Sequence, residues 1–111
     1  MVKIIADKLF EEELDCYLED AYYSFGQKCV DHWQEGYESI LKRLKVFPES
    51  FPPVSELKGV GLLVRGAILM DNFKVIYHYD ESINVVFLHD IWDMRKSSRN
   101  LRLRFDKFDH I

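Results

Sequence analysis

Apolar residues recur at two different spacings along this chain, and the change of spacing separates a helical part from a strand-like part. Within residues 7–47 they return every three or four positions, which aligns them along one face of a helix. Asp7 is suited to cap the first helix and Gly26 to end it, so the pattern predicts an antiparallel helical hairpin. The two apolar stripes are Phe10, Leu14, Leu18, Ala21 and Phe25, followed by Val30, Trp33, Tyr37, Ile40, Leu41, Leu44 and Phe47.

Beyond a proline-containing linker at 48–59, the apolar positions form short runs separated by turn residues. These runs lie within 60–92, and connections this short favour an antiparallel meander. A further β-type run, Val2 to Ile5, precedes the first helix. The predicted architecture is therefore α+β in the order β-α-α-β-β-β, with the helical hairpin packed on a small antiparallel twisted sheet. We expect a single domain over 1–111 that closes with a basic segment at 93–111.

Alternation along the strands predicts which side chains share a face of the sheet. Lys74 and His78 are expected on the face turned away from the helices. In the preceding run, Val64 and Ile68 suit the helix-covered face, which leaves Arg65 on the opposite one. Arg65 and Lys74 are therefore expected either side by side on the open face or as two separate solvated residues.

A cationic pocket follows from the first of these alternatives. Arg95 and Lys96 come directly after the last strand and are placed to complete a pocket with Arg65 and Lys74. Several cations that converge on one patch suit a phosphate group, because each of them offsets charge on its oxygens.

The charge is unevenly distributed along the chain. The formal net charge is −4, yet the first 57 residues carry 12 acidic and 6 basic side chains, whereas residues 58–104 carry 5 and 8. The overall balance gives no bulk attraction to nucleic acid, but the local field of the basic half can still steer an anionic partner. The acidic helical face is either a solvated surface or a docking surface.

Cofactor and metal binding are not expected. The 4 histidines, at positions 32, 78, 89 and 110, are scattered, and the 2 cysteines lie within predicted helices, so no zinc-type spacing occurs. A signal peptide is not expected either, because the first residues lack a long apolar segment, and no run approaches the length that crosses a membrane. We therefore expect a cytoplasmic protein with free thiols.

Four segments of the sequence together resemble a known family. They are Leu57-Lys58-Gly59, Arg65-Gly66, Phe73-Lys74-Val75-Ile76-Tyr77 and Asp90-Ile91-Trp92-Asp93-Met94-Arg95. An aromatic–basic–apolar–apolar–tyrosine string after a turn, and a last strand that runs into an arginine, are typical of the RelE/ParE superfamily of bacterial toxins. The resemblance implies the toxic half of a type II toxin–antitoxin pair, which inhibits growth and is wrapped by the C-terminal segment of its antitoxin.

The RelE branch of this superfamily implies cleavage of mRNA on the ribosome without a metal ion. A ribose 2′-hydroxyl attacks the adjacent phosphate while a base and an acid move the protons. On this resemblance the catalytic roles fall to Arg65, Lys74, Arg95, His78 and His89, and the RNA contacts to Lys58, Lys96 and Arg99. His89 also alternates with apolar positions, so it is alternatively a half-buried core residue.

Two departures from the RelE pattern keep other branches open. RelE has a tyrosine in its C-terminal segment where this chain has Leu101, and the ribosome-dependent nucleases are usually basic whereas this chain is acidic. ParE-like members share the fold but poison DNA gyrase without a nuclease site. A catalytically degenerate relative that only binds its antitoxin is the third alternative.

Overall fold

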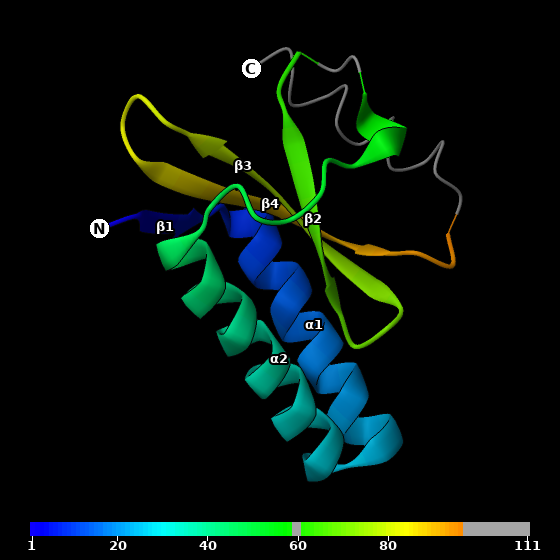
Figure 1. The fold of residues 1–111 in the computed structure, drawn as a ribbon. Coiled ribbons are helices and arrows are strands. Elements are labelled where there is room, and N and C mark those ends of the chain that lie inside the picture. Colours follow the sequence, from blue (N-terminus) through cyan, green and yellow to red (C-terminus); the bar gives the residue numbers. More distant parts are fainter. Residues whose placement is uncertain (59–60, 97–111) are drawn as a thin grey trace.

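A helical hairpin covers one face of a four-stranded sheet (Figure 1). The computed structural model describes residues 1–58 and 61–96. Its elements follow the predicted order β-α-α-β-β-β, with one short 3₁₀ helix, η1, in the linker. In chain order they are β1 Lys3–Ala6, α1 Lys8–Phe25, α2 Gln27–Val46, η1 Ser55–Leu57, β2 Val64–Leu69, β3 Phe73–Asp80 and β4 Val85–Asp93. The prediction of an α+β fold is confirmed.

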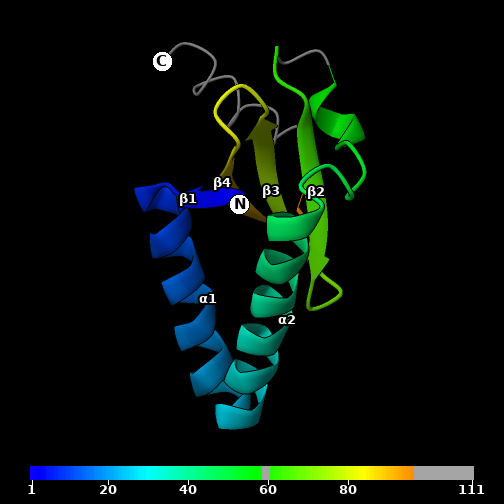
Figure 2. The same ribbon diagram turned by 60° about the vertical axis from the view of Figure 1, so that its left-hand side comes forward.

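The hairpin begins and turns at the two residues that the sequence indicates. Asp7 caps α1, because its carboxylate accepts a hydrogen bond of 2.8 Å from the backbone N–H of Phe10. Gly26 separates the helices with a φ of 87°, a conformation that side chains other than glycine's rarely allow, and its N–H donates to the carbonyl of Tyr22 at 2.8 Å. The joined end of the hairpin extends past the sheet (Figure 2).

The strand order in the sheet is β1-β4-β3-β2. The three later strands form the expected antiparallel meander, since β3 pairs antiparallel with both β2 and β4. The first strand differs from the expectation of an antiparallel sheet, because β1 pairs parallel with β4. The sheet is therefore mixed, and β1 occupies the edge of β4 that the meander leaves unpaired.

Apolar side chains are buried on both faces of the sheet. The face toward the helices holds the larger cluster, in which Phe10 and Leu44 of the helices pack with strand residues. The other face, which we call the open face, carries Lys74, Ile76 and His78 of β3 and is partly covered by a smaller cluster. The members of that cluster are Val54, Leu57, Val64, Ile76 and Trp92.

The two clusters correct the expected orientation of β2. Ala67 and Leu69 are buried against the helices, whereas Val64 packs on the open face. The prediction that Val64 faces the helices is therefore wrong. The alternation along β2 is offset by one position from the expected one. The cause is the linker, which hydrogen-bonds along β2 from Val54 and places apolar side chains over the second face. Because apolar side chains of β2 are buried on both faces, Ala67 and Leu69 on one and Val64 on the other, apolar residues do not alternate with polar ones along it.

No helix in the described part of the chain is long and apolar enough to cross a membrane.

Candidate acid–base site

A β-bulge in β4 brings two of the candidate residues together. The pairing of β3 with β4 shifts between Ile76, which opposes Asp90, and Tyr77, which opposes Leu88. His89 is thus an extra residue with no partner position in β3. Bulges of this kind redirect a side chain and are frequent beside active sites. Here the bulge directs His89 toward His78 on the open face.

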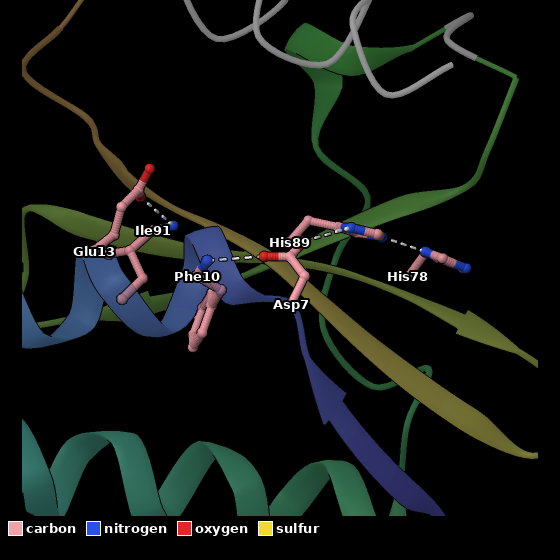
Figure 3. Close-up of polar contacts among 6 residues, drawn as sticks. All are labelled: Asp7, Phe10, Glu13, His78, His89 and Ile91. Atoms are coloured by element: carbon pink, nitrogen blue, oxygen red, sulfur yellow. Dashed lines mark hydrogen bonds and ion pairs between the residues drawn. The ribbon is translucent and has the colours of Figure 1, made fainter. Parts of the chain in front are cut away.

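The imidazole rings of His78 and His89 meet edge to edge. The Nδ1 atom of His78 lies 2.5 Å from the Nε2 atom of His89. The ring planes are within 10° of each other and the centroids are 4.7 Å apart, so the two nitrogens face each other in the plane of the rings. One hydrogen between them makes a hydrogen bond, and Figure 3 shows the contact.

Asp7 continues this line of polar groups on the far side of His89. Its Oδ2 atom lies 3.6 Å from Nδ1 of His89, which is an electrostatic contact longer than a hydrogen bond. The three side chains come from the start of α1, from β4 and from β3, and they form the row Asp7–His89–His78 in Figure 3. We call this row the histidine cluster.

Burial lowers the proton affinity of both histidines. The pKa of His89 is lowered first by burial and then by the neighbouring His78, while Asp7 acts in the opposite direction. The pKa of His78 is lowered by burial and raised to a lesser extent by Asp80. Both rings therefore favour the neutral form at neutral pH, in which each imidazole has one donor and one acceptor nitrogen. A pair of this kind can accept and return a proton.

The first turns of α1 are tied to the strand on both sides of the bulge. The backbone N–H of Asp7 donates to the carbonyl of Leu88 at 3.3 Å. Further along the helix, the Glu13 carboxylate accepts a hydrogen bond of 3.4 Å from the N–H of Ile91 (Figure 3). The position of His89 between these two attachments is thus coupled to the start of α1.

Arg65 does not lie with Lys74. It opposes Tyr77 in the sheet and shares the helix-covered face, and its guanidinium donates a hydrogen bond of 2.9 Å to the carbonyl of Phe51. The expected placement of Arg65 on the open face is wrong, for the same reason that the orientation of β2 was wrong. Its visible role is to hold the linker against the sheet.

Lys74 is on the open face, as alternation predicts. Gly66, on the neighbouring strand, opposes Ile76 rather than Lys74, yet a Cβ atom at Gly66 would overlap the Cγ and Cδ atoms of Lys74. The lysine stem therefore lies across Gly66 and leans toward the half of the sheet that contains His78. Glycine at position 66 provides the space for this path.

Arg95 is engaged by its own neighbour in the sequence. Its Nε and Nη2 atoms each lie 2.9 Å from an oxygen of Asp93, and its backbone N–H donates to the same carboxylate at 3.0 Å. This guanidinium lowers the pKa of the Asp93 carboxyl. It also lies 5.7 Å from the ring centroid of Phe73, at the opposite end of β3 from His78.

The remaining predicted RNA contacts do not converge on one patch in the described residues. Lys96 lines a cavity of about 410 Å³ beside the acidic side chains of α1, and Lys58 is exposed after η1. Arg99 and Leu101 lie outside the described residues. The expected pocket formed by Arg65, Lys74, Arg95 and Lys96 is therefore not assembled.

Asp7 is a site residue whose place beside a histidine is not apparent from the sequence pattern. Its signal in the sequence is that of a helix cap, and the contact with a histidine 82 positions later depends on the tertiary fold. Within residues 1–58 and 61–96, no group of three or more histidine, cysteine or acidic side chains is arranged to hold a metal ion.

The fold is similar to that of a solved toxin–antitoxin structure. The match is to a chain of the structure described as "Chromosomal ParDE TA system from P. aeruginosa", with a TM-score of 0.64 and 16% sequence identity, and it covers 84% of this chain and 96% of the other. No family model matches the sequence, and no curated protein matches it at a significant level. At this identity the likeness concerns the fold, and it confirms the prediction of a RelE/ParE-like architecture.

Proposed function

We propose that this chain is the toxin of a type II toxin–antitoxin pair and that it cleaves mRNA on the ribosome, in the cytoplasm. The observation that carries the proposal is the contact between His78 and His89 on the open face. Two half-buried imidazoles that share a hydrogen are suited to the proton transfers of RNA cleavage. The similarity in fold to a chain of a ParDE structure supports the assignment to toxins.

The proposed reaction is an internal transesterification. A histidine accepts the proton of the ribose 2′-hydroxyl, and the 2′-oxygen forms a bond to the adjacent phosphorus. The bond from phosphorus to the 5′-oxygen breaks, and that oxygen leaves with a proton from an acid. The products are a 2′,3′-cyclic phosphate and a 5′-hydroxyl, so atoms and charge balance without a metal ion. The ammonium group of Lys74, whose stem leans toward His78, can offset the negative charge that develops on the phosphate.

The test is to map cleavage of translated mRNA after induction of the chain. We expect new 5′ ends in mRNA that is being translated, and we expect the same RNA to stay intact when ribosomes are left out. His78→Ala should abolish the cuts, whereas His32→Ala, at an exposed helical position, should keep them. Growth arrest with intact mRNA would overturn the nuclease proposal.

Inhibition of DNA gyrase is the second candidate. It is favoured by the ParDE description of the structural neighbour and by the separate positions of Arg65 and Arg95, each of which is held by another partner. Supercoiling of a relaxed plasmid by purified gyrase tests it. Unchanged supercoiling at a large excess of the chain would exclude this candidate. If mRNA also stays intact when the chain is induced, the result would indicate a degenerate relative.

An antitoxin partner is part of the same proposal. The joined end of the hairpin exposes Tyr22, Tyr23 and Phe25, and a partner that covers exposed aromatic side chains would stabilise so small a domain. Co-expression with the product of the adjacent reading frame should relieve growth inhibition and yield a stable complex. Failure of every neighbouring gene product to bind would contradict it.

A further inference from the structure

The carboxylate of Asp7 serves two neighbours at once. Oδ1 accepts the hydrogen bond that caps α1, from the N–H of Phe10 at 2.8 Å. Oδ2 faces Nδ1 of His89 at 3.6 Å. The hydrogen bond from the Asp7 backbone to Leu88 holds the residue beside the bulge, so both contacts are built into the junction of β1, α1 and β4.

A negative oxygen next to a ring nitrogen favours the tautomer that carries its hydrogen on that nitrogen. A lone pair on Nδ1 of His89 would instead face the charge of Asp7 and be repelled. With the hydrogen on Nδ1, the Nε2 atom of a neutral His89 has the lone pair. The contact of 2.5 Å between the rings needs one hydrogen, and His78 must then supply it from its own Nδ1.

The consequence appears at the far end of the row. A neutral His78 that carries its hydrogen on Nδ1 has a lone pair on Nε2. That atom is the last nitrogen of the cluster and points away from His89 (Figure 3). A change at Asp7 would therefore alter the protonation of an atom two side chains away.

We propose that Asp7 is a positioning residue that selects the tautomers of both histidines and makes Nε2 of His78 the proton-accepting atom of the open face. The catalytic importance of this atom rests on the proposed nuclease function, whereas the tautomers themselves do not. Among residues 1–58 and 61–96, the charged groups that act on the pair are Asp7 beside His89 and Asp80 beside His78.

Two substitutions separate this role from helix capping. Serine and asparagine cap helices about as well as aspartate, so Asp7→Ser and Asp7→Asn should both keep α1. The serine removes the charge from His89. The asparagine can present an amide N–H to Nδ1 of His89, which favours the lone pair on that nitrogen. The hydrogen bond between the two rings would then run in the opposite direction, from Nε2 of His89 to Nδ1 of His78. Asp15→Ser, at an exposed position of the same helix, is the matched control for loss of a carboxylate.

The experiment is nitrogen NMR of the histidine rings in the purified chain, above the pH at which they titrate. In the unaltered protein we expect Nε2 of His78 to lack a hydrogen, and in Asp7→Asn to carry one. Asp7→Ser should give a mixture of tautomers, and Asp15→Ser should match the unaltered protein. A hydrogen on Nε2 of His78 in the unaltered protein, or identical tautomers in all variants, would overturn the inference. Thermal unfolding of each variant verifies that α1 is retained.

RNA cleavage by the same variants separates this inference from the function on which it rests. If the unaltered chain cleaves RNA, Asp7→Asn should lower the rate by about 10²-fold, the lower range for loss of a general base. Cleavage with unresponsive tautomers would reject the role of Asp7 and retain the nuclease. Responsive tautomers without any cleavage would reject the nuclease and retain the role of Asp7 in selecting tautomers.

Discussion

The histidine cluster and the Asp93–Arg95 pair are two ionisable groups of one sheet with opposite properties. Arg95 is bound by a carboxylate two positions away in the sequence, and its side chain is 65% exposed. His89 is only 16% exposed and meets partners that lie 11 and 82 positions away. The arginine has its charge neutralised locally, whereas the histidines are neutral groups whose hydrogens are shared among three elements.

This difference distinguishes an ion pair that has a structural role from side chains that can transfer a proton. The Asp93 side chain is 12% exposed, but the guanidinium that it binds is 65% exposed, so salt screens the charge of the arginine. Two imidazoles in partial burial have lowered pKa values and can exchange a proton with a substrate. The comparison therefore favours the histidine cluster, not the arginine after the last strand, as the centre of any chemistry on this sheet.

The largest effect is expected from removing the histidines singly and together. His78→Ala and His89→Ala should each lower RNA cleavage by about 10²-fold or more, within the range for general acid–base groups. Because the two rings act as one unit, the double variant should cleave RNA no more slowly than the less active of the two single variants. Single-turnover cleavage rates measure this, and fully additive losses would show that the rings act independently.

A smaller effect is expected from the cation that leans toward the cluster. Lys74→Ala should lower the cleavage rate by about tenfold, which corresponds to about 1.4 kcal/mol of lost transition-state stabilisation. Lys45→Ala, at an exposed position in the last turn of α2, is the matched control. Equal rates for the two variants would remove Lys74 from the site.

The cluster should also make the free energy of unfolding depend on pH. Because burial lowers the pKa of both histidines, the unfolded chain binds protons more readily than the native protein below about pH 6.5. Stability should therefore fall as the pH drops from about 7 to 5, and this slope should be smaller in His89→Gln than in His32→Gln. Urea unfolding at several pH values measures it, and equal slopes in both variants would contradict the burial argument.

The smallest effect on cleavage is expected from Arg95. Phe73, which Arg95 contacts, and His78 are five positions apart in β3. This is about 17 Å along a strand, which exceeds the distance over which exposed charges act at physiological salt. Arg95→Ala should thus change the rate by less than about threefold. A loss comparable to that of His78→Ala would reverse the comparison and restore the arginine to the site.

Local patterns predicted the elements more accurately than they predicted the faces of the sheet. Asp7, Gly26 and the helical stripes are local signals, and α1 and α2 follow them. Alternation placed Lys74 and His78 correctly because β3 has one polar and one apolar side at those positions. It failed for Arg65 because the linker buries Val64 on the second face of β2, so that polarity no longer distinguishes the two sides of this strand.

The histidine pair was predicted only as two separate candidates. His78 and His89 each carry chemistry that the sequence reveals, but their contact depends on a bulge that shifts the pairing by one residue. A shift of this size has no compositional signal, because it arises from how two strands and the start of α1 fit together.

The order of elements, the two helices and their joint are thus determined by the sequence, because caps, glycine and apolar spacing act within a few residues. The meeting of Asp7, His89 and His78 was decided only in the tertiary structure. Contacts between residues 11 and 82 positions apart depend on strand register and on packing across the sheet, and neither is encoded in any one segment of the chain.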